Sequence, residues 1–431
     1  MTATANRARE NFIPLRRREV VDLLVDDPAL DPTDRDRFRA LCDLLAATIH
    51  HAFGERLDGL KQAYAPFDPD TDTRATVARE DVDRDDARRR LVDGLTELLE
   101  RANYERIDAR TLDKALEAES LLKVKLHADP DEFSEALFFR RGAAEHTEEL
   151  SSLFGLRKRT LRFIAYERVL VFISFQEREW FEARDRDLED LRFEPGSTLL
   201  KLFRNVPEAD LEMLFPNSEV RMRPIDKLAV GIPAAGTGLF LLVTKLLAPI
   251  AFLVSLVLVW LGVRDGDPQV DQGQVLLLAG AVGGLAAWMW KQWVSFKTRK
   301  VEFMQRVTDD LYFKNLANDV AALHYLVDAA EDEEVKEAIL AAWACVVVGR
   351  PATLDELDQR MEAWLAGHGC ADVDFEVDDA VGKLERLGLV GHVGDGRYEM
   401  VPLDGALAML DARWDGLFDH PPPATDAGST T

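Results

Sequence analysis

Two apolar runs in the middle of the chain constrain its fold more than any other feature of the sequence. The first, 239–261, contains one charged residue, Lys245, and the second, 275–294, is uncharged up to Lys291. At about 1.5 Å per residue the first run would form a helix about 34 Å long, against a bilayer core of about 30 Å. Helices on the surface of a globular protein keep a polar face, which both runs lack. The runs therefore predict a two-helix transmembrane hairpin over 228–296.

The charges that flank the hairpin predict its orientation. Positive charge stays on the cytoplasmic side of a bilayer, and the loop between the runs is acidic. No apolar signal segment follows the first residues, so we expect a multi-pass cell-membrane protein with both termini in the cytoplasm. Six basic residues would then face anionic lipid headgroups: Arg221, Arg223, Lys227, Lys297, Arg299 and Lys300.

Small residues in the second run indicate helix packing. Gly280, Gly284 and Ala287 recur at a spacing that lets two helix backbones approach closely. Lys245 in the first run could be a functional intramembrane charge, but it lies near the cytoplasmic end, so we expect its ammonium group to snorkel to the interface.

The composition is strongly acidic. The chain of 431 residues has a formal net charge of −25, with 39 Arg against 14 Lys and 45 Asp against 33 Glu. Such a surface stays hydrated in concentrated salt, which favours a halophilic host; codon bias towards Arg and Asp is the alternative. The same balance argues against nucleic-acid binding, which needs clustered Lys and Arg.

The sequence before the hairpin predicts a helical region over 1–110 and a small α+β domain over 111–227. Apolar residues spaced by three and four, from Phe38 to Phe53, indicate a long helix capped by Thr33 or Asp34. Alternating apolar residues at 121–126, 159–176 and 197–205 indicate strands of an antiparallel sheet, with a short helix after Pro207.

A helical segment is predicted over 297–350, with one long helix from about 298 to 329. Asn315 and Asn318 fall on or beside its apolar face, either as a polar binding patch or as amides that fix packing register. The carboxylate run 330–337 lacks the glycine and the ligand spacing of a calcium site. We therefore interpret it as the solvated start of another helix.

The C-terminal region, 351–420, predicts a winged-helix-like domain. Thr353 would cap a first helix, a second helix would follow, and a hairpin would turn at 394–396 before a final helix. The second helix carries no net positive charge, which favours protein–protein contact or oligomerisation over DNA binding. The tail, 421–431, has the composition of a disordered segment.

Several blocks resemble a known family. YERVLVFISF at 166–175, LLKLFRNVPEADLEMLFPNSEVRM at 199–222 and LYFKNLANDVAALHYLVDAAEDEEVKEAIL at 311–340 are similar to the domain-of-unknown-function 3754 family, which includes the transmembrane-protein-143-like proteins. The resemblance extends over most of the chain. It implies a two-pass membrane protein with no established reaction or cofactor.

No catalytic, cofactor or metal motif is found by sequence. Cys42, Cys345 and Cys370 are too scattered for a disulfide framework. The fold class is therefore α+β with a transmembrane hairpin, and the predicted function is a non-enzymatic scaffold that self-associates or recruits a protein partner. The alternative is a membrane-tethered enzyme or small-molecule sensor that uses the α+β domain. Its active site would draw on polar residues of the family-like blocks: Tyr166, Arg168, Lys201, Arg204, Asp210 and Glu212.

Overall fold

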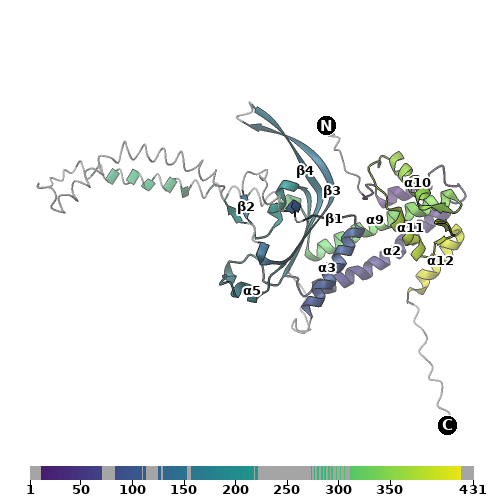
Figure 1. Ribbon diagram of the computed structural model, residues 1–431, viewed down its shortest axis with the longest axis horizontal. Helices are drawn as coiled ribbons and strands as arrows, with labels where there is room; N and C mark the ends of the chain where they lie inside the picture. The colour runs from purple at the N-terminus through teal and green to yellow at the C-terminus, as the bar shows by residue number, and fades with distance from the viewer. Residues whose placement is uncertain are drawn as a thin grey trace, which may run out of the picture. The chain divides into compact units, whose positions relative to one another are not determined.

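The computed structural model describes residues 11–69, 83–108, 110–112, 125–127, 130–152, 157–217, 219–221 and 311–418, together with scattered positions from 273 to 305 (Figure 1). The chain divides into two compact units. The larger contains 1–111, 130–208 and 315–431, and the smaller contains 112–129 and 209–314.

A five-stranded antiparallel sheet lies in the larger unit, in the order β1-β3-β4-β5-β7. The long central strands β3 and β4 form a hairpin, and their apolar residues alternate between two covered faces, as in Val169, Leu170, Val171 and Phe172 of β4. The strands are β1 (Glu105–Arg106), β3 (Phe133–Ser152), β4 (Arg157–Phe175), β5 (Thr198–Pro207) and β7 (Asn315–Asn318).

Three helices pack on one face of this sheet (Figure 1): α2 (Arg35–Tyr64), α3 (Arg84–Arg101) and α9 (Asp319–Val348). The C-terminal half of α2 and the N-terminal half of α9 share one apolar core with α3 and the sheet, including Phe53, Leu95, Phe172 and Leu326. We call this the sheet core.

A second apolar core lies at the other ends of the same two helices. There the N-terminal half of α2 and the C-terminal half of α9 pack with α1 (Arg17–Val25) and with the C-terminal elements, through Leu41, Ile339, Trp343 and Leu384. We call this the C-terminal core. Because α2 and α9 pass through both cores in opposite directions, they are antiparallel. They join the sheet to the C-terminal elements.

The C-terminal elements follow one another as expected from the sequence: two helices, a hairpin and a final helix. Thr353 accepts from the backbone N–H of Glu356, whose carboxylate accepts in return from the Thr353 N–H, so the predicted cap is found as a complete capping box. Three short strands pair in the order β8-β10-β9. The elements are β8 (Ala352–Thr353), α10 (Leu354–Gly367), α11 (Val377–Arg386), β9 (Val390–His392), β10 (Arg397–Met400), α12 (Leu403–Asp415) and η6 (Gly416–Phe418).

The remaining elements are short. In the larger unit they are η2 (Pro130–Glu132), α5 (Arg178–Glu182) and η3 (Leu188–Asp190). The strands β2 (Lys125–His127) and β6 (Glu219–Arg221) pair in the smaller unit. The helical turn η4 (Glu208–Leu214) follows β5 directly, at the position predicted after Pro207.

Among the residues that the structure describes, no helix combines the length and the apolar character needed to cross a bilayer. This finding contradicts the predicted transmembrane hairpin, the two-pass topology and the cell-membrane location. The longest described helices, α2 and α9, have 30 residues each, but charged side chains interrupt both and protein covers their apolar faces. The first predicted span, 239–261, lies outside the described residues, as do the loop and the tail 421–431. The second is described only at scattered positions.

Two predictions for the region after 297 are also wrong. The expected helix over 298–329 is interrupted, because Asn315–Asn318 forms β7 against β5 and α9 begins only at Asp319. The carboxylate run 330–337 is not a solvated helix start: it lies in the middle of α9, and Glu333, Glu334 and Lys336 are buried. In both cases tertiary pairing outweighs the local pattern.

Candidate anion-binding site

The middle of α9 carries a buried polar layer that separates the sheet core from the C-terminal core. Ala330 belongs to the first core and Val335 to the second. The charged side chains of this layer are Glu331, Glu333, Glu334, Lys336 and Glu337. A buried charge is tolerated only when it is paired, so the partners of these side chains define the chemistry of the layer.

One part of the layer is closed by the N-terminal segment of the chain. The Lys336 ammonium donates to the Glu333 carboxylate at 2.6 Å and to the carbonyl oxygens of Ile13 at 2.8 Å and Leu15 at 3.1 Å. Glu333 accepts in turn from the Ile13 N–H at 3.1 Å. The Lys336 and Glu333 side chains are each 2% exposed. We call these groups the Lys336 cluster.

The other part of the layer is centred on Lys383 of α11. Its ammonium lies 3.0 Å from Glu334 and 2.8 Å from Asp379, and it also donates to Glu337. The second oxygen of Glu334 accepts from the Arg101 guanidinium at 2.9 Å. We call these groups the Lys383 cluster.

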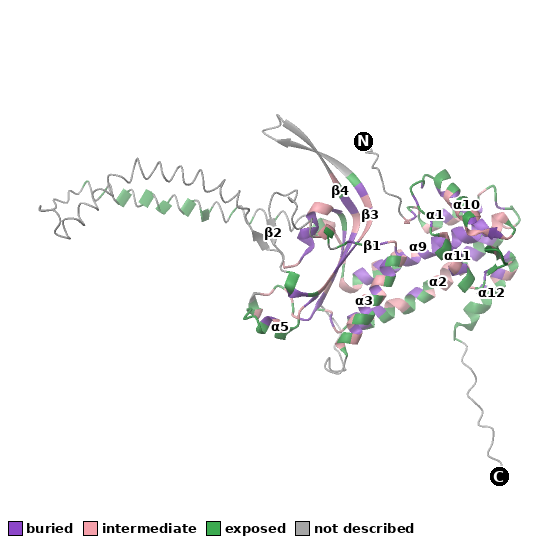
Figure 2. Ribbon diagram, in the orientation of Figure 1, coloured by how far each residue is buried: buried purple, intermediate pink, exposed green. Residues whose placement is uncertain are grey.

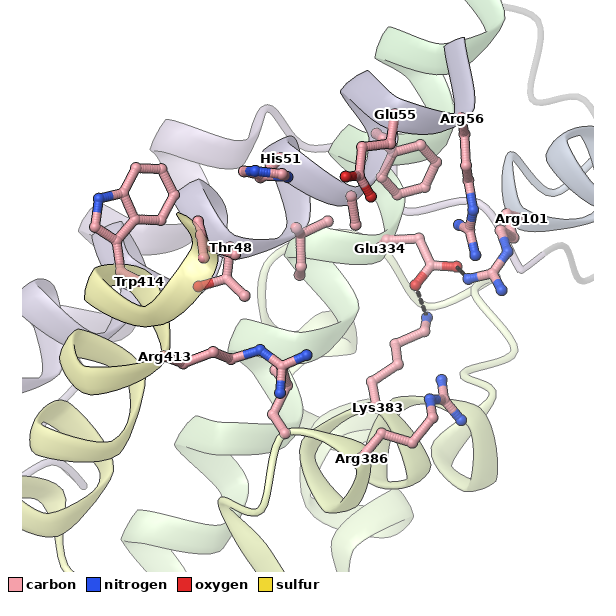
Figure 3. Close-up of a pocket in the computed structure, with 15 residues that line it drawn as sticks. Thr48, His51, Glu55, Arg56, Arg101, Glu334, Lys383, Arg386, Arg413 and Trp414 are labelled. Carbon is pink, nitrogen blue, oxygen red and sulfur yellow. Dashed lines mark hydrogen bonds and ion pairs between the residues drawn. The ribbon is translucent and has the colours of Figure 1, made fainter. Parts of the chain in front are cut away.

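The Lys383 cluster borders a cavity of about 440 Å³ between α2, α11 and α12 (Figure 3). This volume lies within the usual range for small-molecule sites, about 300–1,000 Å³. Figure 3 shows Lys383 reaching up to Glu334, and Arg413 extending into the cavity from α12. The lining residues are Thr48, Ile49, His51, Ala52, Phe53, Glu55, Arg56, Arg101, Glu334, Lys383, Arg386, Leu387, Arg413, Trp414 and Leu417.

The cavity is locally basic in a strongly acidic protein. Five Arg or Lys side chains line it against two carboxylates, those of Glu55 and Glu334. Of the five, Lys383 and Arg101 are occupied by the carboxylates of the Lys383 cluster, and Arg56 lies 3.4 Å from Glu97. Arg386 approaches Asp379 only at 3.8 Å, and Arg413 makes no ion pair with any described residue. Arg413 and Arg386 are therefore the cations that can bind an anion.

The opposite end of the cavity is aromatic. The His51 ring lies edge-on to the Trp414 indole, with centroids 6.3 Å apart, and 6.0 Å from the Phe418 ring. Trp414 is 43% exposed and Phe418 is 78% exposed. α12 is a mostly exposed helix, whereas α9 behind the cavity is buried (Figure 2).

Burial and charge shift the titration of the Lys383 cluster. Burial raises the pKa of Glu337 to about 7, against the opposing effect of the Lys383 ammonium. Burial opposes the charge of Lys383, but Glu337, Glu334 and Asp379 outweigh it, so the pKa of Lys383 is raised. The pKa of Arg101 is also raised, because Glu334 and Glu97 outweigh its burial. The two cations thus stay charged, whereas Glu337 titrates near neutral pH.

The structure does not bring the residues predicted as membrane contacts into this site. Arg221 ends β6, whereas Arg223, Lys227, Lys245, Lys297, Arg299 and Lys300 lie outside the described residues. Gly280, Gly284 and Ala287 are helical and exposed, and a Cβ built on either glycine has no neighbour within 4 Å, so the described residues include no helix packed on them. Their predicted helix-packing role stays a prediction.

Asn315 and Asn318 lie at the ends of β7, at the edge of the sheet. Asn318 precedes α9 without capping it through its side chain, and the side-chain Oδ1 of Asn315 is buried without a hydrogen bond among the described residues. The proposed polar patch is therefore a sheet edge, and neither asparagine lines the cavity.

The polar residues offered as an active site are spread over β4, β5 and η4. Tyr166 donates to Glu208 at 3.1 Å, and burial raises the pKa of its phenol. Arg168 reaches the Tyr325 hydroxyl at 3.4 Å. Lys201 and Arg204 lie on β5, and Asp210 and Glu212 are buried in η4. The contacts of Tyr166 and Arg168 join β4 to η4 and to α9, and the active-site role of these six residues stays a prediction.

The residues that line the cavity are not recognisable from the sequence as one site. One signal was available: the carboxylate run 330–337 contains Lys336 and is followed by an apolar stretch, which is atypical of a solvated helix. In the described part of the chain, no three His, Cys, Asp or Glu side chains gather to hold a metal ion. The layer is thus a set of ion pairs in which cations balance the carboxylates.

The structure is an α+β fold with a basic cavity, which is a candidate small-molecule site. Comparison with known proteins identifies the family. Residues 166–321 match the model of a family described as protein of unknown function (DUF3754). The chain therefore carries the domain of this family, which confirms the resemblance of the middle sequence blocks. No solved structure matches the chain. The residues that line the cavity lie outside the matched segment.

Proposed function

We propose that this chain is a binding protein and that the cavity beside the Lys383 cluster takes a small anionic ligand. The observation that carries the proposal is the local reversal of charge: five cations surround one cavity of a chain whose net charge is −25. Arg413 and Arg386 are both exposed, so their guanidinium groups are accessible to a ligand. An anion in the cavity would accept short charge-assisted hydrogen bonds from them.

The sequence suggests a small-molecule sensor as an alternative function, with its ligand site in the α+β domain. We propose instead that the ligand site lies at the junction of the two cores. α2 and α9 pass through both the sheet core and the C-terminal core, and the cavity lies at the layer between these cores. A ligand at this position would contact α2, α11 and α12 together and would stabilise their mutual packing.

Thermal unfolding of the full chain with inorganic pyrophosphate tests the proposal. Because a ligand that binds only the folded state stabilises it by mass action, we expect the melting temperature to rise with pyrophosphate at constant ionic strength. The variant Arg413→Ala should lose the shift, whereas Arg178→Ala, an exposed arginine of α5, should keep it. An equal shift in both variants, or none in the parent, would refute the proposal.

Self-association is a second candidate function, favoured by one observation. The end of α12 and η6 expose apolar side chains: Met409 is 42% exposed, Leu417 36% and Phe418 78%. A second copy of the chain would cover them. Light scattering after size exclusion should give a mass above one chain, and Phe418→Ser should lower it; a monomer at all concentrations would remove this candidate.

A further inference from the structure

The two ends of the cavity differ in chemistry, and this difference narrows the class of ligand. The inference rests on the proposed function, because it assumes that the cavity binds an anion. At one end Arg413 and Arg386 are available to a negative group. At the other end stand the Trp414 indole and the His51 ring. A free inorganic anion would use only the first end.

The Trp414 indole is available as a stacking surface. Its ring contact with His51 is edge-on, at an interplanar angle of 89°, and no described ring stacks on its face. Aromatic rings gain from face contact with another flat ring, and an indole left 43% exposed beside a cavity has such a face to offer. Base–aromatic stacking is worth about 1–3 kcal/mol per base.

The arginine and the tryptophan come from consecutive residues of α12. Arg413 and Trp414 both line the cavity, so one rigid helix presents a cation and an aromatic ring to the same ligand. Arg386 adds a second cation from α11, across the cavity from α12. Lys383 and Arg101 lie deeper in the Lys383 cluster and are held by Glu334.

We infer that the cavity binds anions that carry a flat aromatic group, the class represented by nucleoside monophosphates. The phosphate lies against Arg413 and Arg386, and the aromatic group lies on the face of Trp414. Arginine suits this role because its planar fork offers two parallel donors to phosphate oxygens. The cavity volume of about 440 Å³ accommodates one such molecule.

Isothermal titration of the full chain with matched probes tests the inference. The probes are the adenosine, guanosine, cytidine and uridine monophosphates, ribose 5-phosphate, which lacks the aromatic group, and adenosine, which lacks the phosphate. We expect at least one nucleoside monophosphate to bind tenfold or more tightly than ribose 5-phosphate, and adenosine to bind more weakly than its monophosphate. The variant Trp414→Leu should abolish the tenfold ratio and keep ribose 5-phosphate binding. Trp180→Leu on α5 is the matched control and should change neither.

Salt separates the contribution of the phosphate group to binding from that of the aromatic group. Screening at about 1 M KCl shortens the Debye length to about 3 Å, so binding of ribose 5-phosphate should weaken while the ratio given by the aromatic group persists. Equal affinities for ribose 5-phosphate and all four nucleoside monophosphates would overturn this inference and leave the anion site standing. Adenosine binding as tightly as its monophosphate, or no binding of any phosphate, would overturn the proposed function as well.

Discussion

The Lys336 cluster and the Lys383 cluster both use carboxylates from the middle of α9, yet of these two clusters the Lys383 cluster borders the cavity. Both consist of a buried ammonium and the carboxylates of the 330–337 run. The N-terminal segment covers Lys336, and the carbonyls of Ile13 and Leu15 use its remaining donors. Lys383 has only carboxylate partners, and its surroundings open towards Arg386 and Arg413. The same chemistry is thus structural where the chain covers it and available for binding where the chain leaves a cavity.

Replacement of Lys336 should have the largest effect. Lys336→Met would leave Glu333 buried without a cation and would remove the donors to the N-terminal segment, so we expect the free energy of unfolding to fall by about 3–5 kcal/mol. Urea denaturation measures it. Adding Glu333→Gln to this variant removes the buried charge and should recover part of the loss. A loss below about 1 kcal/mol would break the comparison, since the Lys336 cluster would then not be structural.

Replacement of Lys383 should cost less. In Lys383→Met, Arg101 still pairs with Glu334, and Glu334 lines the cavity, where water can reach it. We expect a loss of about 2–3 kcal/mol in the same denaturation experiment. A loss in the free energy of unfolding as large as that of Lys336→Met would show that water in the cavity does not stabilise the carboxylates left without Lys383.

The stability of the protein should depend on pH through Glu337. Its pKa in the folded state is about 7, above the ordinary value of 4.5, so the folded state binds the proton more tightly than the unfolded state. Its contribution is fully present below about pH 4.5 and is lost as pH rises through 7, at roughly 1.4 kcal/mol per unit of pKa difference. Glu337→Gln should flatten this part of the stability profile, measured by urea denaturation from pH 5 to 8, whereas Glu97→Gln should not. An unchanged slope would assign the titration to another group.

The smallest expected effect on stability is that of Arg413. The side chain makes no ion pair with a described residue, so Arg413→Ala should change the free energy of unfolding without ligand by less than about 0.5 kcal/mol. The same variant should lose the stabilisation by pyrophosphate. A large loss of stability in the absence of ligand would mean that Arg413 supports the fold, and the contrast with Lys336 would disappear.

Much of the secondary structure could be predicted because its signals are local. The 159–176 and 197–205 alternations correspond to β4 and β5, the helix after Asp34 is α2, and Thr353 caps α10. β3 is not predicted from the sequence, since its outer half is rich in small and charged residues and lacks apolar alternation, so that only its pairing with β4 identifies it as a strand. The sequence predicts a helix over the four residues of β7 for a related reason. These residues form a strand because they pair with β5, and this pairing leaves no local signal in the sequence.

The candidate site could not be predicted, because its residues come from five separate segments of the chain. Periodicity shows which face of α11 is apolar, but not that Lys383 on that helix lies against Glu334 of α9. The sequence predicts a solvated carboxylate run because an isolated stretch of acids costs too much to bury. The cations that remove this cost lie at positions 101, 336 and 383, and two of them are remote from the run.

By itself the sequence determined the local elements, the acidic balance and the family resemblance, since caps, alternation and residue blocks act over a few neighbours. Tertiary structure alone decided that α2 and α9 run through two cores, that the charged middle of α9 is buried between them, and that Arg413 and Trp414 line a cavity. The physical reason is that a charge is buried or solvated according to the partners that the fold brings to it. Those partners are set by long-range packing and not by neighbours in sequence.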